Sequence, residues 1–240
     1  MSRLVLKNLV KTYNGKTVVD QVSLNVDQGK VTGLLGPNGA GKTTTFYMTV
    51  GMIRPETGTV LLDQEDITRH PMYIRARKGI GYLPQETSIF KKLTVRENIT
   101  AILEVIDKKE TNIRRKADSL MEELGISALA GQKAASLSGG ERRRLEISRV
   151  LATAPLFILL DEPFAGIDPL AVIDIQQIIS QLTDKGIGVL ISDHNVRETL
   201  GVCDTAYIMS QGVVMESGTP EKIISSKVAK RIYLGDNFRL

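Results

Sequence analysis

The segment at residues 36–43, Gly-Pro-Asn-Gly-Ala-Gly-Lys-Thr, limits the possible folds of this chain more than any other segment does. It has the spacing G-x-x-x-x-G-K-[ST], in which glycines let consecutive backbone N–H groups turn toward one anion. A continuous apolar run precedes it at residues 31–35, and a short helical pattern follows from Lys42. A buried strand, a glycine-rich loop and a helix start, in this order, predict a site for the phosphates of a nucleotide.

Residues of this phosphate loop are expected to take separate roles. Lys42 reaches the β and γ phosphates, and the Thr43 hydroxyl is a ligand for Mg²⁺, the expected cofactor. A chance glycine-rich turn is the alternative interpretation, which the order of strand, loop and helix disfavours. The residues predicted to bind the nucleotide here are Gly36, Pro37, Asn38, Gly39, Ala40, Gly41, Lys42, Thr43 and Thr44.

A second apolar run, at residues 157–160, ends in two carboxylates. Phe-Ile-Leu-Leu is typical of a buried strand, and Asp161 and Glu162 follow it directly. Ligands of open α/β sheets bind at the carboxyl ends of the strands. Asp161 is therefore predicted to hold Mg²⁺ directly or through water, and Glu162 to act as general base on the attacking water. Taken alone, the pair fits an acidic cap on a surface turn equally well, and the phosphate loop is what favours catalysis.

A third element, at residues 137–141, reads Leu-Ser-Gly-Gly-Glu and precedes an arginine-rich helical stretch. Ser138 and Glu141 form the pattern of a capping box, which is the purely structural interpretation. Gly139 and Gly140, beside this N-cap serine, expose backbone N–H groups at a helix end. The element is therefore a candidate for a second anion site in a chain that already has one.

The phosphate loop, the Leu-Ser-Gly-Gly-Glu element and the acidic strand end follow one another in this order along the chain. In that order they resemble the nucleotide-binding domain of ATP-binding cassette (ABC) transporters, and the resemblance covers nearly the whole chain. It implies one nucleotide-binding domain over residues 1–240, with ATP as the substrate. The implied fold is α/β, an ABC-type P-loop NTPase with a RecA-like parallel sheet as its core. An antiparallel β region near the N-terminus and an α-helical subdomain complete this fold.

The middle of the chain carries the pattern expected for that helical subdomain. Thr94 and Glu97 form a second capping box, and apolar residues then recur at helical spacing. A second helical pattern ends at Gly125, so residues 88–150 are predicted to form a helical insertion in the α/β core. Strand patterns resume further on, and the last two, joined by a Gln-Gly turn, predict a hairpin. They lie at residues 156–160, 188–192, 206–210 and 213–216.

The resemblance also implies roles that the patterns alone do not give. Tyr13 falls where these domains stack an aromatic ring on adenine. Gln85 matches the glutamine that contacts Mg²⁺ or the attacking water and senses the membrane subunits. His194 matches the histidine that reaches the γ-phosphate. Asp168 matches the loop that touches the opposite subunit, although residues 165–167, Ala-Gly-Ile, depart from the commoner Ser-Ala-Leu.

One copy of each motif implies an assembly of two chains. In this family the Leu-Ser-Gly-Gly-Glu element of one domain faces the phosphate loop of another. Ser138, Gly139 and Gly140 are therefore expected to contact ATP bound to a second copy. A head-to-tail homodimer with two composite sites is the economical arrangement.

Composition indicates a protein outside the bilayer, with no nucleic-acid partner. The longest clean apolar run, residues 156–160, is far shorter than the about 20 residues of a membrane-spanning helix. A net charge of +4 is only a mild basic excess, and the single Cys203 and the absence of a signal-peptide pattern fit a reducing cytosol. The resemblance to ABC transporters implies a peripheral location on the cytoplasmic face of the inner membrane, where two transmembrane permease subunits on separate chains hold the dimer.

Phe90 is the expected contact with those permease subunits. It is apolar amid polar and charged neighbours, in a segment that in this family usually meets the coupling helices of the permease. A core anchor for the following helix is the alternative interpretation. Lys91 and Lys92 follow directly, and a basic pair suits a surface loop better than the edge of a core.

Five stretches narrow the resemblance to the ATPases of lipopolysaccharide exporters, which implies extraction of lipopolysaccharide from the inner membrane for export to the outer membrane. ATPases of branched-chain amino-acid importers are the alternative, because no residue is predicted to touch the cargo. A chromosome-maintenance ATPase is disfavoured because no sustained heptad repeat separates the phosphate loop from the Leu-Ser-Gly-Gly-Glu element. The five stretches are residues 36–47, 136–144, 161–169, 193–200 and 233–240.

Overall fold

A computed structural model describes residues 2–106, 109–235 and 238, and it divides the strands between two sheets. The larger sheet contains β3 (Val31–Leu35), β6 (Ile80–Leu83), β7 (Phe157–Asp161), β8 (Gly188–Ser192), β9 (Thr205–Ser210) and β10 (Val213–Gly218). The smaller sheet contains β1 (Arg3–Tyr13), β2 (Lys16–Asp27), β4 (Thr57–Leu62) and β5 (Glu65–Asp66).

The larger sheet has the order β10-β9-β3-β8-β7-β6, and all its neighbouring strands run parallel except the β9–β10 hairpin. The smaller sheet has the order β2-β1-β4-β5 and is antiparallel. The predicted α/β fold, with its parallel core, N-terminal antiparallel region and closing hairpin, is thus confirmed. Strands β3, β7 and β8 are buried at every position, which explains their continuous apolar sequences.

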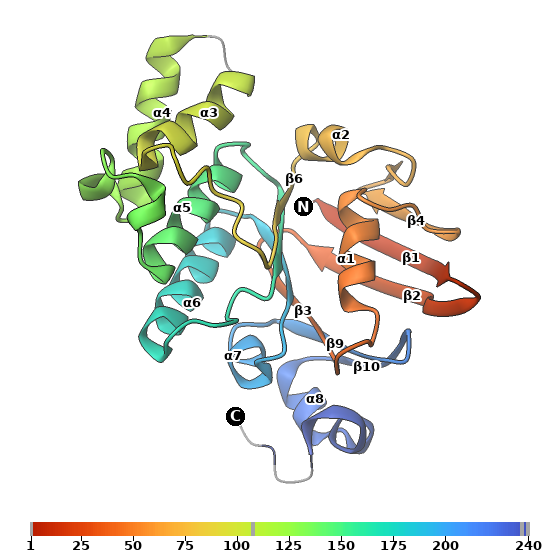
Figure 1. Ribbon diagram of the computed structural model, residues 1–240. Coiled ribbons are helices and arrows are strands. Elements are labelled where there is room, and N and C mark those ends of the chain that lie inside the picture. The colour runs from red at the N-terminus through yellow and green to blue at the C-terminus, as the bar shows by residue number, and fades with distance from the viewer. Residues whose placement is uncertain (1, 107–108, 236–237, 239–240) are drawn as a thin grey trace.

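Helices cover both faces of the larger sheet (Figure 1). Helix α1 lies between the two sheets, where Phe46 and Met48 join a core built from both. On the opposite face, Ile175 and Ile179 of α6 pack with Ile158 and Leu160 of β7. The longer helices are α1 (Lys42–Val50), α3 (Val95–Ile106), α4 (Glu110–Glu123), α5 (Gly139–Leu151) and α6 (Pro169–Asp184), and the shorter ones are α2 (Met72–Arg77), α7 (Val196–Leu200), α8 (Pro220–Ser225) and α9 (Lys227–Ala229).

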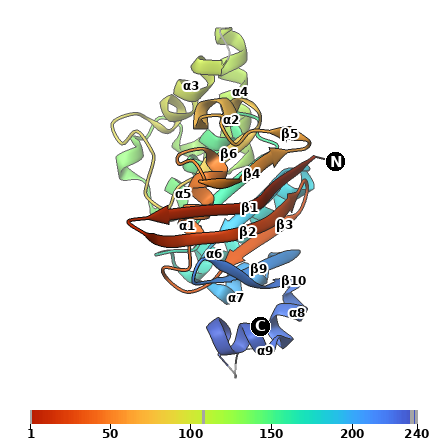
Figure 2. The same ribbon diagram turned by 90° about the vertical axis from the view of Figure 1, so that its right-hand side faces the viewer.

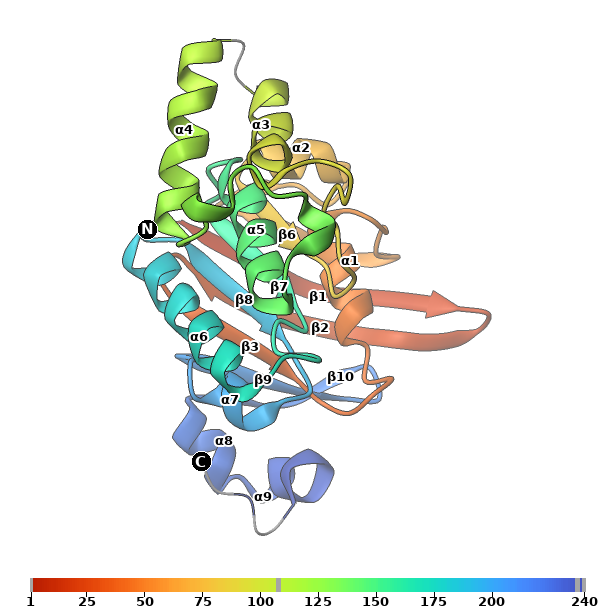
Figure 3. The ribbon, with the colours of Figure 1, turned by 60° about the vertical axis from the view of Figure 1, so that its left-hand side comes forward.

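Helices α3, α4 and α5 form the helical region expected from the middle of the sequence. Figure 3 shows α3 and α4 projecting beyond the sheet, whereas Leu145 of α5 shares a core with Leu160 of β7. The Thr94 hydroxyl accepts from the Glu97 amide at 3.1 Å, and the Glu97 carboxylate accepts from the Thr94 amide at 2.7 Å. In the described part of the chain, no helix combines the length and the apolar character needed to cross a bilayer.

The C-terminal segment is structured, although its sequence gave no clear pattern. Helices α8 and α9 and a π-helical turn at Lys230–Leu234 pack below the larger sheet (Figure 2). Ile223 and Ala229 are fully buried there against Leu35 and Ile208. Of the stretch at residues 233–240 used in the sequence comparison, residues 236–237 and 239–240 lie outside the described residues.

Candidate active site

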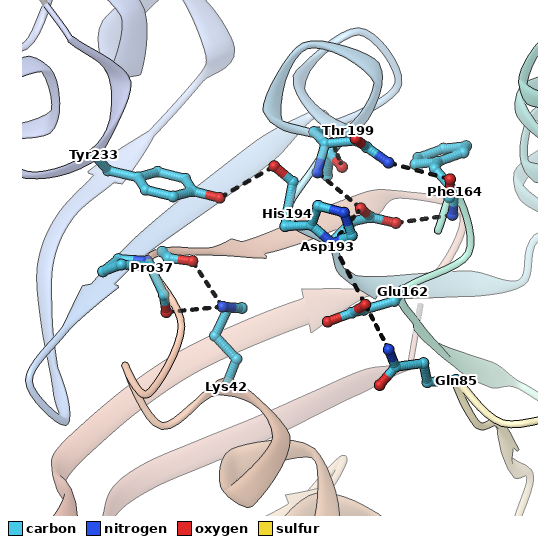
Figure 4. Close-up of polar contacts among 11 residues, drawn as sticks. Pro37, Lys42, Gln85, Glu162, Phe164, Asp193, His194, Thr199 and Tyr233 are labelled. Carbon is cyan, nitrogen blue, oxygen red and sulfur yellow. Dashed lines mark hydrogen bonds and ion pairs between the residues drawn. The ribbon is translucent and has the colours of Figure 1, made fainter. Parts of the chain in front are cut away.

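Three neighbouring strands bring the predicted site residues together. Strand β8 lies between β3 and β7, so Ser192 at its end is in register with Asp161. Beyond their ends, β3 continues into the phosphate loop, β7 into Glu162 and β8 into His194. Figure 4 shows Lys42, Glu162 and His194 directed into the same space. Parallel strands therefore place these groups at one edge of the sheet, as expected for ligand sites of α/β proteins.

Lys42 is anchored inside the phosphate loop. Its side chain is 7% exposed, and Nζ donates to the carbonyl oxygens of Gly36 at 2.7 Å and Pro37 at 3.1 Å (Figure 4). Burial lowers the pKa of Lys42, while the nearby Glu162 and Asp161 carboxylates oppose the shift. The ammonium group is thus held in the loop by carbonyl oxygens that phosphate oxygens can replace.

Two glycines of the loop are required by close backbone contacts. A Cβ on Gly36 would lie 2.1 Å from the Met209 carbonyl oxygen, and one on Gly41 would lie 2.4 Å from the Val18 carbonyl oxygen. Gly41 also adopts a φ of 102° at the N-terminus of α1, a region that favours glycine. Thr43 follows in the first turn of the helix, where it is exposed.

Asp161 is a buried carboxylate whose surroundings suit a cation. It is 3% exposed, and burial raises its pKa to about 6, while the Tyr82 hydroxyl donates to Oδ2 at 3.3 Å. No group of three or more His, Cys, Asp or Glu side chains forms a metal cluster among the described residues. Mg²⁺ commonly uses one or two protein ligands together with phosphates and water, so Asp161 and the Thr43 hydroxyl fit this cation.

Glu162 lies between the other two predicted catalytic residues. Its Oε2 accepts a hydrogen bond from Gln85 Nε2 at 2.8 Å and lies 3.4 Å from Nδ1 of His194 (Figure 4). Its φ of 48° is unusual for a residue other than glycine, and its amide donates to the Ser192 carbonyl at 2.6 Å. Residues held in such backbone regions cluster at active sites, and this one turns the carboxylate out of the strand and into the site.

Asp193 is a site residue that the sequence analysis missed. It is fully buried, its two oxygens accept from the amides of Phe164 and Asn195, each at 2.8 Å, and burial raises its pKa. The Asn195 amide side chain also donates to the Phe164 carbonyl at 3.1 Å. These bonds join the loop after β7 to the loop after β8. The sequence could have indicated Asp193, because it is an acidic residue between a buried strand and His194.

The remaining predicted residues lie on other elements. Ser138 is the N-cap of α5 and forms the capping box with Glu141. Asp168 caps α6 by accepting from the Ala171 amide at 3.0 Å. Tyr13 is the last residue of β1 and is 44% exposed, and the centre of its ring lies 5.3 Å from the Lys11 ammonium group.

A cavity of about 160 Å³ connects two of the predicted elements within one chain. Glu162 and Gln85 line one part of it, and Gly139 and Arg143 of α5 line another. The Leu-Ser-Gly-Gly-Glu element and the candidate general base therefore border the same space.

Comparison with known proteins agrees with this geometry. The family model described as ABC transporter matches residues 19–165. The lipopolysaccharide export system ATP-binding protein LptB of Escherichia coli strain K12 is 56% identical, that of Haemophilus influenzae 55%, and that of Acidithiobacillus ferridurans 52%, each over the full length of both chains.

Solved structures show the same fold. The ADP conformation of MJ1267, an ATP-binding cassette of an ABC transporter, has a TM-score of 0.89 and 31% identity, and the match covers 98% of this chain and 100% of that one. A dimeric post-hydrolysis state of the cassette MJ0796 with ADP and Pi has a TM-score of 0.80 and 25% identity, over 90% of this chain and 98% of that one. From the site geometry, the family match and the full-length relatives together, it follows that the chain belongs to the ATP-hydrolysing subunits of ABC transporters.

Proposed function

We propose that the chain powers a lipopolysaccharide exporter, in which ATP hydrolysis drives extraction of lipopolysaccharide from the inner membrane for export to the outer membrane. Full-length relatives that carry this function in their names are 52–56% identical, which favours an exporter over a branched-chain amino-acid importer. The main structural support for ATP hydrolysis is the position of the Glu162 carboxylate, which lies between Gln85 and His194 beside the phosphate loop.

ATP binding begins with the loop and its lysine. The Lys42 ammonium group exchanges the carbonyl oxygens of Gly36 and Pro37 for β- and γ-phosphate oxygens, which carry more negative charge. Exposed amides at the start of α1 complete the phosphate contacts, and the Tyr13 ring stacks on adenine. Thr43, Asp161 and Gln85 would hold Mg²⁺, which supplies charge neutralisation at the phosphates when it is bound with ATP.

Glu162 accepts the proton of the attacking water. Gln85 donates to Oε2 of this carboxylate, which fixes its orientation and leaves Oε1 for the water. His194 lies on the other side and places its imidazole at the γ-phosphate. Catalysis then depends mainly on positioning and charge stabilisation, as in other phosphoryl transfers.

The second half of each site comes from another copy of the chain. A Cβ on Gly139 would meet nothing within 4 Å, and one on Gly140 only the Ala171 Cβ at 3.9 Å. Glycine in a helix is about 1 kcal/mol less favourable than alanine, so packing within the chain does not explain these glycines. Close approach of the γ-phosphate bound to a second copy explains them, with Ser138 beside it and Asp168 at the contact between the copies. The dimeric relative with ADP and Pi supports this homodimer.

Phe90 docks the permease subunits. Its side chain is 46% exposed, while the Asn98 side chain accepts from its amide at 2.8 Å and donates to its carbonyl at 3.1 Å. The Arg149 guanidinium lies 4.6 Å from the centre of its ring. The backbone and one face of Phe90 are thus fixed, and the rest of the ring is presented to a partner. Two transmembrane permease subunits, one on each copy, hold the dimer on the cytoplasmic face of the inner membrane.

Transport by the purified complex tests this function. The tagged chain is purified with its membrane partners and placed in vesicles that contain lipopolysaccharide. ATP should drive removal of lipopolysaccharide from these vesicles. The Glu162→Gln variant should assemble normally but should not remove lipopolysaccharide, because its ATP hydrolysis should be about 10²–10⁴-fold slower. Glu122→Gln, at an exposed position of α4, is the matched control and should behave as the parent. Partners that import amino acids, with no removal of lipopolysaccharide, would contradict the proposal.

A further inference from the structure

We propose that Glu146 is a positioning residue for ATP hydrolysis, because its carboxylate holds the segment that carries Gln85 against α5. The inference rests on the proposed role of Gln85 beside Glu162. Glu146 lies in α5, two residues after the arginine-rich stretch that follows the Leu-Ser-Gly-Gly-Glu element. No sequence pattern connected this glutamate with catalysis.

Glu146 forms a buried ion pair within α5. Its Oε2 lies 3.2 Å from Nη1 of Arg143, one helical turn earlier, and the two side chains are only 4% and 9% exposed. Burial lowers the pKa of Arg143, and the Glu146 carboxylate opposes this shift. A buried pair that serves only the fold can often be replaced by apolar side chains without loss of stability. The hydrogen bonds that this pair makes to other elements are therefore informative.

Both members of the pair hold the segment between β6 and α3. The Ser88 amide donates to Oε1 of Glu146 at 3.0 Å, and Nη1 of Arg143 donates to the Pro84 carbonyl oxygen at 3.3 Å. Arg149, one further turn along α5, donates to the Ser88 carbonyl oxygen. Residues spaced by three are neighbours on a helix surface, so these three side chains act together. They fix the backbone of residues 84–88 at both ends.

Gln85 lies within this fixed stretch. The Pro84 carbonyl belongs to the peptide bond between Pro84 and Gln85, so Arg143 holds the backbone of the glutamine. The Gln85 side chain in turn donates to Oε2 of Glu162 at 2.8 Å. All four ionic or catalytic groups, those of Glu146, Arg143, Gln85 and Glu162, line the same cavity of about 160 Å³. Continuous contacts thus run from Glu146 to the candidate general base.

The segment needs this support because residues 84–90 form no helix or strand. Before it, β6 packs closely on α5 (Figure 3), where a Cβ on Gly81 would lie 2.5 Å from Cγ1 of Val150. After it, the Asn98 side chain accepts from the Phe90 amide at 2.8 Å. Between these two anchors, side chains of α5 supply the hydrogen bonds to the backbone. Without Glu146, Gln85 should move more freely relative to the carboxylate that it orients.

Glu146→Gln tests this role, since glutamine keeps the shape and an oxygen for the Ser88 amide but removes the charge beside Arg143. We expect kcat of the full chain to fall about threefold to thirtyfold, as for one weakened charge-assisted hydrogen bond, with KM for ATP unchanged. Glu97→Gln is the matched control, because Glu97 also accepts a backbone amide, from Thr94 at 2.7 Å, and lies 3.7 Å from a lysine ammonium group. It should leave kcat unchanged.

A double variant separates positioning from folding. Arg143→Met combined with Glu146→Leu replaces the buried pair by apolar side chains, a change that often keeps or raises stability. The double variant should melt near the parent temperature, whereas kcat should fall about tenfold to a hundredfold because the hydrogen bonds to residues 84 and 88 are lost. A parent kcat in the double variant would overturn the inference. A melting temperature well below that of Glu97→Gln would also overturn it, by assigning the pair to the fold.

A second background separates this inference from the role of Gln85. In single-turnover assays, Glu146→Gln should have no further effect on a Gln85→Ala chain, because the carboxylate acts through that glutamine. An unchanged kcat in the single variant, an equal fall in both backgrounds or a rise in KM alone would overturn the inference and leave the role of Gln85 intact. Full activity of Gln85→Ala alone would instead overturn the proposed role of Gln85, and this inference with it.

Discussion

Asp161 and Glu162 are neighbours in sequence, yet the structure gives them different surroundings. Asp161 ends a buried strand, and its carboxylate is shielded from water. Glu162 has a left-handed φ of 48°, which turns its side chain toward Gln85 and His194. A single change of backbone conformation therefore separates a candidate cation ligand from a candidate base.

The raised pKa of Asp161 predicts a specific effect of pH on stability. A carboxyl with a pKa of about 6 in the folded chain, above its ordinary value of 3.8, stabilises the fold at low pH. That contribution is lost as pH rises toward about 6. Asn does not titrate, so the unfolding free energy of Asp161→Asn should rise relative to the parent between about pH 4 and pH 7.

Urea unfolding of the nucleotide-free chain across this pH range measures the difference. Asp184→Asn, at an exposed position near the end of α6, is the control and should show no such trend. A difference for Asp161→Asn that stays constant with pH would mean that burial does not raise the pKa of this carboxyl. Mg²⁺-dependent hydrolysis should be lost in Asp161→Asn at every pH.

Among the elements, the first turn of α5 combines a structural and a functional requirement. The capping box of Ser138 and Glu141 fixes the helix start, while Gly139 and Gly140 leave its surface bare. Gly139 lies on the cavity that Glu162 also lines. The helix could therefore begin without glycine. A larger side chain at these positions would, however, keep a phosphate bound to a second copy further from the helix start.

Gly139→Ala should separate these two requirements. Its Cβ meets nothing in the chain, and alanine favours a helix over glycine by up to about 1 kcal/mol, so the melting temperature should stay the same or rise. ATP binding by the monomer should be unchanged, whereas hydrolysis should fall because the methyl group lies between two copies. Gly131→Ala is the control, since a Cβ there also meets nothing within 4 Å. Normal hydrolysis by Gly139→Ala would argue against a composite site.

For the whole molecule, the head-to-tail arrangement predicts complementation between variants. A Ser138→Ala chain mixed with a Lys42→Ala chain forms heterodimers in which one site has both defects and the other has none. ATPase activity should partly recover on mixing, up to about half of the parent rate if each site turns over alone. The measurement includes a check that heterodimers form. No recovery in confirmed heterodimers would mean that each chain completes its own site or that both sites must be intact.

Phe90→Ala addresses the assembly with membrane subunits. The ring is 46% exposed, so its loss should change the melting temperature of the isolated chain by no more than about 3 °C. ATP binding should remain, but the permease subunits should no longer co-purify, since an exposed aromatic anchor can supply about 2 kcal/mol or more. A large fall in the melting temperature would instead assign Phe90 to the core of the helical region.

The sequence by itself determined the parts of the site that depend on local backbone pattern. The phosphate loop, the buried strand before Asp161 and the capping boxes of α3 and α5 are each specified by residues within about ten positions. Periodicity likewise indicated the parallel core and the hairpin. Short elements lacked enough residues for a period, so β5, α2 and the C-terminal helices were not predicted.

Only the tertiary structure decided which of these parts meet. The contact between Gln85 and Glu162 spans 77 positions, and it forms because β6 lies beside β7. His194 reaches the same carboxylate because β8 lies between β3 and β7, an order that no local pattern encodes. Local sequence sets backbone conformation and burial, whereas strand order and packing over long separations set the distances between reacting groups.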